Sequence, residues 1–206
     1  RAFYDLARSR GIRLILDETY RDFDSRTGPV HDLFTDPDWD ETLIDLYSFS
    51  KAYRLTGHRV GALIGAPALM DEAEKFIDSV TICPNQLGQH AALWGMRHLA
   101  DWLAGERREI LARRAAIETG FPVLADQGWK LRGLGAYFAF VEHPLDLPSD
   151  AVAQALIEKA GILLLPATMF GPADDRWTRT GLRIAFANID RAGIATLFDR
   201  LAALPY

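Results

Sequence analysis

The segment from Ser48 to Gly61, S-F-S-K-A-Y-R-L-T-G-H-R-V-G, concentrates side chains that could bind a phosphate group next to a reactive amine. Ser48, Ser50 and Arg59 could form a phosphate site from two hydroxyls, loop N–H groups and one guanidinium. A lysine held in such a cradle, Lys51, loses part of its hydration, which lowers its pKa and makes it a nucleophile for carbonyls. The alternative is a solvated basic turn, although such turns rarely lead from one apolar strand pattern directly into another.

Asp17 is the second candidate, within the segment D-E-T-Y that follows the apolar run I-R-L-I-L. In open α/β sheets, ligands bind outside the carboxyl ends of the strands, which is where this carboxylate is expected. The alternative is an aspartate that caps a helix or closes a loop.

Arg183 is the third candidate, a lone arginine in the apolar segment T-G-L-R-I-A-F-A-N. Strand alternation places Leu182 and Ile184 on one face and Arg183 on the other. Arginine is almost never fully buried unless it is paired. Arg183 therefore faces solvent, pairs with a nearby acid (Asp174, Asp175 or Asp190), or waits for the carboxylate of a ligand.

Apolar runs and helical spacing predict the elements that must position these residues. Expected strands cover residues 12–16, 42–47, 60–65, 129–132, 136–142, 162–165 and 182–187. The run at 12–16 follows a helical pattern and Gly11, which is typical of a buried strand in a parallel sheet. Expected helices include one of about ten residues that starts at Pro67, one over 85–103, a charged one that follows an interruption at Gly105, and two over 149–160 and 190–204. The arginines at 107, 108, 113 and 114 are interpreted as the solvent face of the charged helix.

Composition restricts the class of protein. The 206 residues carry a formal net charge of −5, with 49% hydrophobic and 25% charged residues, which is ordinary for a globular chain. The single cysteine, Cys83, excludes an internal disulfide and a thiolate metal site, and the histidines show no ligand spacing, so no metal is expected. The mild acidity gives no reason to expect a nucleic-acid partner, and no apolar run approaches the roughly 20 residues of a membrane span. The second half of the chain has the pattern of a small α+β layer, which predicts a domain boundary between residues 103 and 104.

Taken together, these motifs resemble those of the class I/II aminotransferases, a family of fold-type I pyridoxal-phosphate enzymes. D-E-T-Y resembles the family's D-E-x-Y, and S-F-S-K, with Arg59 eight positions after Lys51 and then Gly61, resembles its lysine motif. L-R-I-A-F-A resembles its late arginine strand. The resemblance covers nearly the whole chain and implies an α/β fold. Residues 1–103 would be the carboxyl-terminal part of a large, mainly parallel αβα sandwich, and residues 104–206 a small α+β domain.

The resemblance assigns a role in binding pyridoxal 5′-phosphate to several residues. Lys51 would form a Schiff base with the cofactor aldehyde and then act as the proton-transferring base. Asp17 would face the pyridine nitrogen and keep it protonated, so that the ring accepts electrons. Tyr20 would hydrogen-bond the 3-oxygen of the ring. The phosphate would be held by Ser48, Ser50 and Arg59.

The resemblance also implies a substrate. The protein would move an amino group between an amino acid and a 2-oxo acid, with Arg183 binding the substrate carboxylate in a bidentate pair. Tyr137 would line the substrate pocket, or be an ordinary strand aromatic. The full-length protein is expected to be a cytoplasmic homodimer with no membrane or nucleic-acid partner.

Several family features precede the D-E-x-Y strand: a glycine-containing phosphate loop, an aromatic residue stacked on the ring, and an asparagine near the 3-oxygen. Only 16 residues precede Asp17 here. We therefore expect the carboxyl-terminal part of an aminotransferase, lacking about half of the large domain and inactive alone. Alternatives are a lyase on the same fold, the effector-sensing domain of a transcriptional regulator, and an α/β binding domain without cofactor.

Overall fold

The computed structural model describes residues 1–172 and 174–204, and the chain divides into two compact units, Arg1–Arg107 and Arg108–Tyr206. The division falls inside a helix, after Arg107, whereas the sequence predicted a boundary between residues 103 and 104. That the two parts are a large cofactor-binding domain and a small domain stays a prediction. Each unit is described by itself.

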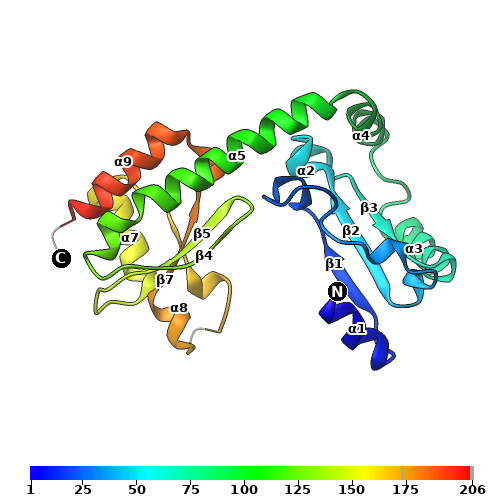
Figure 1. The fold of residues 1–206 in the computed structure, drawn as a ribbon, viewed down its shortest axis with the longest axis horizontal. Coiled ribbons are helices and arrows are strands. Elements are labelled where there is room, and N and C mark those ends of the chain that lie inside the picture. The colour runs from blue at the N-terminus through cyan, green and yellow to red at the C-terminus, as the bar shows by residue number, and fades with distance from the viewer. Residues whose placement is uncertain (173, 205–206) are drawn as a thin grey trace. The chain divides into compact units, whose positions relative to one another are not determined.

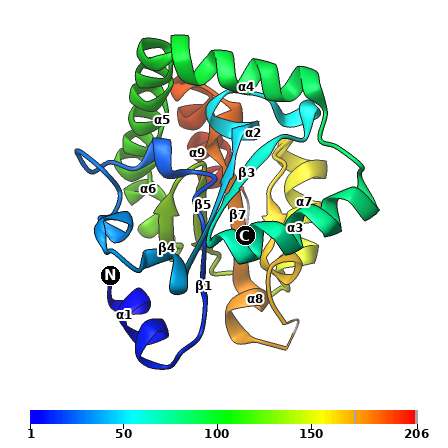
Figure 2. The same ribbon diagram turned by 90° about the vertical axis from the view of Figure 1, so that its right-hand side faces the viewer.

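A three-stranded sheet organises the first unit. Its strands are β1 (Leu14–Asp17), β2 (Leu43–Ser48) and β3 (Gly61–Ile64), which lie side by side in that order (Figures 1 and 2). β1 and β2 are parallel, and β3 is antiparallel to β2. The strands predicted at 12–16, 42–47 and 60–65 are therefore confirmed, each end shifted by two residues at most.

β1 differs from the buried strand that the sequence predicted. Leu14 and Leu16 pack against the buried cluster of Tyr4, Leu33 and Leu43. Ile15, on the opposite face, is 60% exposed. The strand is half-covered because only one of its faces meets this cluster in the described parts of the chain.

The helices of the first unit are α1 (Ala2–Ser9), α2 (Phe49–Ala52), α3 (Pro67–Val80), α4 (Gln86–His98) and the first part of α5 (Ala100–Gly120). Two of them, α3 and α4, begin within one residue of the predicted starts, whereas α2 was not predicted. Pro67 occupies the first turn of α3, and the Asn85 side chain caps α4 by accepting a hydrogen bond from the Gly88 N–H at 3.0 Å.

The predicted interruption at Gly105 is wrong. The break falls at Leu99, which leaves helical dihedrals between α4 and α5. Gly105 lies inside α5, because a helical glycine costs only about 1 kcal/mol relative to alanine. The buried side chains of Ile110 and Ile117 anchor the same helix.

The second unit is built on a four-stranded sheet in the order β4-β5-β7-β6, with α7 and α9 along one side of it (Figure 1). Its strands are β4 (Lys130–Gly135), β5 (Phe138–Glu142), β6 (Leu165–Pro166) and β7 (Gly181–Ala185). Its further helices are α6 (Pro122–Ala125), α7 (Ser149–Ala160), α8 (Arg176–Thr180) and α9 (Arg191–Ala202).

Three of these strands are shorter than expected, and β5 begins two residues late because residues 136 and 137 form a turn. β6 pairs with β7 only through Leu165 and Pro166, and Leu163, in the expected strand, is 73% exposed. β7 ends at Ala185 because Phe186–Asn188 form a 3₁₀ turn.

The arginines of α5 are not simply its solvent face. Arg107 donates from Nε (2.9 Å) and Nη2 (2.7 Å) to the Asp24 carbonyl. Arg113 donates from Nη1 to the Ala187 carbonyl at 2.7 Å. Both side chains are half-buried, since the planar guanidinium can satisfy loop carbonyls that lack other donors.

No helix in the described part of the chain is both long and apolar enough to span a membrane.

Candidate functional site

The register of the first sheet brings the predicted cofactor residues to one edge. Asp17 is the last residue of β1 and pairs with Leu46, two residues before the end of β2 at Ser48. Ser48 in turn pairs with Gly61, the first residue of β3. Because parallel strands end at the same edge, the end of β1, the end of β2 and the start of β3 lie together.

Gly61 is required at this edge because β2 and β3 approach closely. A Cβ atom on Gly61 would lie 2.8 Å from the Tyr47 carbonyl oxygen. Any side chain there would push the two strands apart, and with them Ser48 and the loop that holds Lys51.

Lys51 follows directly after β2, in the single-turn helix α2. Its side chain is half-buried, and its Nζ makes no hydrogen bond or ion pair with another described residue. The turn that carries it is fixed at both ends. Ser48 Oγ accepts a hydrogen bond from the Ser50 N–H at 3.2 Å, and Thr56 Oγ1 donates to the Ser50 carbonyl at 2.9 Å. The sequence therefore builds a rigid turn that presents an amine without a partner.

The three predicted phosphate residues differ in exposure. Ser50 is 8% exposed, Ser48 is half-buried and Arg59 is exposed. Arg59 has a left-handed backbone with φ of 52°, and its Nη1 donates to the Thr56 carbonyl at 3.0 Å. One of its five N–H donors is thus used by the loop, and the remaining donors are available to an anion.

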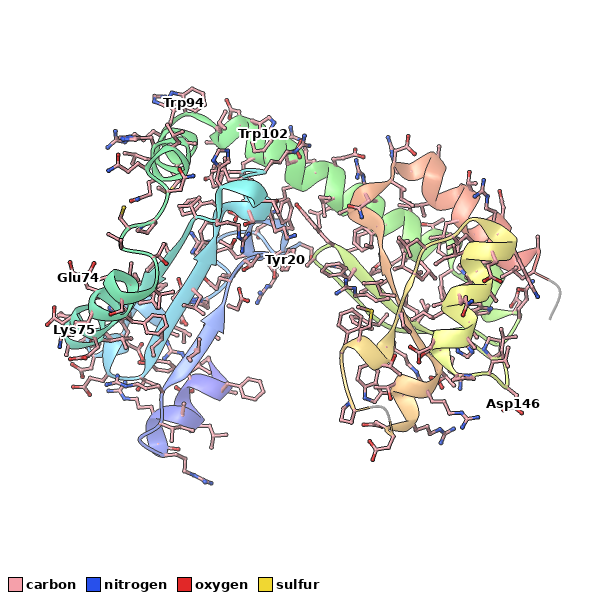
Figure 3. All side chains as sticks on the ribbon, turned by 180° about the vertical axis from the view of Figure 1, so that it is seen from behind. Tyr20, Glu74, Lys75, Trp94, Trp102 and Asp146 are labelled. Atoms are coloured by element: carbon pink, nitrogen blue, oxygen red, sulfur yellow. The ribbon has the colours of Figure 1, made fainter. Side chains whose placement is uncertain are left out.

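Asp17 is exposed at the end of β1, and Tyr20 follows it in the loop, beyond the end of that strand (Figure 3). Asp17 Oδ1 accepts hydrogen bonds from the Thr19 N–H (3.0 Å) and Thr19 Oγ1 (2.5 Å). Oδ2 has no partner among the described residues. Asp17 is thus a loop-closing aspartate, as the alternative held, and it also keeps one oxygen open.

Arg183 lies in the second unit, in the middle of β7. The burial of Leu182 and Ile184 confirms the predicted alternation, and Arg183 occupies the other face. Its guanidinium carbon lies 4.3 Å from the ring centre of Phe138 and 4.2 Å from that of Phe170. Its Nε is buried without a hydrogen bond in the described residues, and Asp174, Asp175 and Asp190 form no ion pair with it. The two rings contact the guanidinium, and none of the described residues forms an ion pair with its N–H groups.

Tyr137 lies in the turn before β5, where its carbonyl accepts a hydrogen bond from the Phe186 N–H at 3.0 Å. Its side chain is half-buried. Tyr137 thus joins this turn to the end of β7, and its role at a substrate pocket stays a prediction.

The sequence reasoning missed a buried polar cluster near the edge that carries Asp17 and Ser48. Asp45, in the middle of β2, is fully buried, and Glu18, the neighbour of Asp17, is 9% exposed. His31 Nε2 lies 3.0 Å from Glu18 Oε1. Asp45 could have been noticed as an acid in an otherwise apolar strand, but the distant His31 carried no sequence signal.

A pocket of about 500 Å³ adjoins this cluster within the first unit; Glu18, His31, Tyr53 and Arg107 are among its lining residues. Among residues 1–172 and 174–204, no group of three or more His, Cys, Asp or Glu side chains could hold a metal ion.

Comparisons with known proteins identify relatives of this chain. The family described as aminotransferase class I and II matches residues 1–201. An aspartate aminotransferase of Thermococcus kodakarensis is 27% identical over 176 residues, which cover 83% of this chain and 44% of that protein. An LL-diaminopimelate aminotransferase of Moorella thermoacetica is 25% identical over 191 residues, which cover 91% of this chain and 48% of that protein.

The fold is shared with solved structures. The aromatic aminotransferase from Pyrococcus horikoshii superposes with a TM-score of 0.82 at 21% identity, over 98% of this chain and 53% of that one. The chain thus spans about half the length of the relatives it matches. Its mixed α/β architecture is part of the fold of the type I aminotransferases. The chain therefore belongs to the class I and II aminotransferase family.

Proposed function

We propose that this chain is part of a pyridoxal 5′-phosphate-dependent aminotransferase that transfers an amino group between an amino acid and a 2-oxo acid. The observation that carries the proposal is the meeting of Asp17, Ser48, Lys51 and Arg59 at one edge of a sheet. The cytoplasmic location and the homodimer of the full-length protein stay predictions.

The donor set at this edge fits the cofactor. It offers an amine without a partner, an open carboxylate oxygen, a phenol, two serine hydroxyls and a guanidinium with spare donors. Lys51 would hold the aldehyde end, Asp17 the ring nitrogen and Tyr20 the 3-oxygen. Ser48, Ser50 and Arg59 would hold the phosphate. When bound, the cofactor supplies a carbonyl that reacts with amines and a ring that accepts electrons.

The protein side chains would then do four things. Asp17 would stabilise positive charge on the ring nitrogen through its own negative charge. Lys51 would carry a proton to and from the reacting carbon on Nζ, where no described neighbour competes for it. Arg183 would bind the substrate carboxylate through its unpaired fork. Tyr20 would donate or accept a hydrogen bond at the ring oxygen and so fix the orientation of the ring.

Reductive trapping tests this proposal. The intact protein should be incubated with pyridoxal 5′-phosphate, reduced with borohydride and digested, and the modified peptide should contain Lys51. Lys51→Ala should lose both the label and the cofactor absorbance band. Lys75→Ala is the matched control, because Lys75 is an exposed lysine paired with Glu72. A label on Lys75, Lys130 or Lys159 would contradict the assignment.

A further inference from the structure

Asp45 is a buried acid that the proposed chemistry does not use. Its side chain is 0% exposed, and no N–H or O–H group of the described residues donates a hydrogen bond to either of its oxygens. A buried ionised carboxylate without donors would be strongly unfavourable. Asp45 therefore needs a proton or a partner.

Glu18 faces Asp45 and already has cationic or N–H partners. Arg21 Nη1 lies 3.3 Å from Glu18 Oε2, and His31 Nε2 lies 3.0 Å from Glu18 Oε1. The Leu33 N–H donates to His31 Nδ1 at 3.2 Å, so a neutral ring carries its proton on Nε2, which lies near Glu18 but makes no hydrogen bond in the described residues. Glu18 thus has a guanidinium beside one of its oxygens, whereas neither oxygen of Asp45 receives a hydrogen bond from a described residue.

Burial and the neighbouring Glu18 charge raise the pKa of Asp45 to about 6, whereas Arg21 and His31 act in the opposite direction. Two ionised carboxylates are both acceptors and cannot hydrogen-bond each other. A single proton on Asp45 turns it into a donor to Glu18 and removes one buried charge.

We propose that Asp45 and Glu18 share one proton, carried by Asp45, and that this buried acid pair positions the turn that bears Asp17 and Tyr20. The backbone connects the two functions. The Glu18 N–H donates to the Leu46 carbonyl at 2.8 Å, and the Arg21 N–H donates to the Glu18 carbonyl at 3.1 Å. Tyr20 lies inside that turn. Loss of the proton places two like charges in the interior and displaces Glu18, together with the backbone on either side of it.

The remaining polar groups around the pair do not replace the proton. Tyr47, on β2, donates from its hydroxyl to Asp22 Oδ2 at 2.7 Å, and the Arg21 guanidinium lies 4.4 Å from the Tyr47 ring centre. From α1, Tyr4 packs with the apolar Leu33 and Leu43. Arg21 and His31 are therefore the groups that oppose the negative charge on Asp45.

Carboxyl ¹³C NMR titration of the protein tests the pair directly. The Asp45 carboxyl carbon should titrate near pH 6, and the amide resonances of Thr19 and Tyr20 should shift with the same midpoint. Asp45→Asn keeps an N–H donor to Glu18 but cannot ionise, so the Thr19 and Tyr20 amides should no longer shift near pH 6. Glu18→Gln should lower the Asp45 midpoint, because the opposing negative charge is gone. Asp71→Asn, on the exposed face of α3, is the control and should change nothing.

An Asp45 midpoint close to the ordinary value of about 4 would overturn the proposal. So would Thr19 and Tyr20 amides that keep titrating near pH 6 in Asp45→Asn. If Asp45→Asn fails to fold, the Asp45 midpoint in the unmodified protein and its shift in Glu18→Gln still test the shared proton. None of these readouts depends on cofactor or activity.

Discussion

The two oxygens of the Asp17 carboxylate differ: one has a structural role, and the other is open for the electrostatic role that we propose. Oδ1 closes the turn with Thr19, whereas Oδ2 stays open. Asp17→Asn keeps a carbonyl oxygen for Thr19 and removes the charge, so it separates the two roles. Two unit charges about 4 Å apart at an effective dielectric constant of about 20 interact by roughly 4 kcal/mol.

We therefore expect Asp17→Asn to lower kcat by roughly a thousandfold, with a much smaller loss of cofactor affinity. Steady-state kinetics and cofactor titration measure the two effects. Thr19→Ala is the control, because it removes a hydrogen-bond partner but leaves the charge. A loss below about tenfold for Asp17→Asn, equal to that of Thr19→Ala, would reduce Asp17 to a loop residue.

The Arg183 guanidinium lies against the rings of Phe138 and Phe170, an environment that suits a planar, delocalised cation better than an ammonium. Arg183→Lys should weaken binding of amino acids and 2-oxo acids by about 10- to 100-fold, the equivalent of about 1.5–3 kcal/mol for a charged hydrogen bond. The cofactor absorbance band should not change, and amines without a carboxylate should react as before. Substrate titration of the band measures this.

Arg179→Lys provides the comparison, because the Arg179 side chain is 63% exposed. If Arg183→Lys unfolds the protein or loses cofactor while substrate affinity is unchanged, then Arg183 is structural.

At the scale of elements, the turn after α2 contains a strained residue. Arg54 has a left-handed backbone with φ of 56°, a conformation that costs a non-glycine residue about 1 kcal/mol. Its guanidinium pairs with Glu106 and lies 5.6 Å from the Trp102 ring centre. These contacts tie the Lys51 turn to the start of α5 within the first unit.

Arg54→Ala should lose the contacts and keep the strain, and so lower the free energy of unfolding by about 1 kcal/mol. Arg54→Gly loses the same contacts but relieves the strain, and should lie within about 0.5 kcal/mol of the parent protein. Urea denaturation compares the two, and Glu106→Gln isolates the ion pair. Equal stability of the Ala and Gly variants would show that the left-handed conformation stores no strain.

The sequence predicted most elements because short apolar runs, Pro67 and Asn85 act locally. It failed where tertiary packing decides: Gly105 stays helical because Ile110 and Ile117 anchor α5, and Ile15 is exposed because one face of β1 is open. The edge that unites Asp17, Ser48 and Lys51 follows from motif order and parallel pairing. The pairing of Asp45 with Glu18 depends on the register between β1 and β2, and the position of His31 depends on the path of the loop between them. Neither can be deduced from the spacing of residues in the sequence.

At the scale of the whole molecule, the two units should respond to pH in opposite directions. The raised pKa of Asp45, about 6 against an ordinary 3.8, means that the folded first unit holds this proton more tightly than the unfolded chain. The free energy of unfolding of this unit should therefore fall by about 3 kcal/mol as pH rises from 3.8 to about 6. In the second unit, burial lowers the pKa of His143, which packs edge-on to Trp129. The unfolded chain binds that proton more readily, so stability there should fall as pH drops below about 6.5.

Amide hydrogen exchange resolved by residue can follow β2 and β5 separately. Protection of β2 should decrease from about pH 4 to about pH 7 and that of β5 should increase. Asp45→Asn should flatten only the first trend and His143→Phe only the second. Parallel trends in both strands would contradict the assignment of these two groups.

The pairing of β1 with β2 also bears on how the family's chains can change in length. Asp17 and Lys51 are placed relative to each other by hydrogen bonds between the strands, not by residues 18–42 that connect them. Gly28 lies in an exposed stretch of that connection with φ of 84°, and each doubling of a loop costs only about 0.6 kcal/mol in closure entropy. Insertions beside Gly28 should therefore hardly change the position of Asp17 relative to Lys51, whereas deletion of one residue within β2 would turn the residues that follow it to the opposite face of the sheet. Insertions and deletions among related chains should therefore be common near Gly28 and rare within β2.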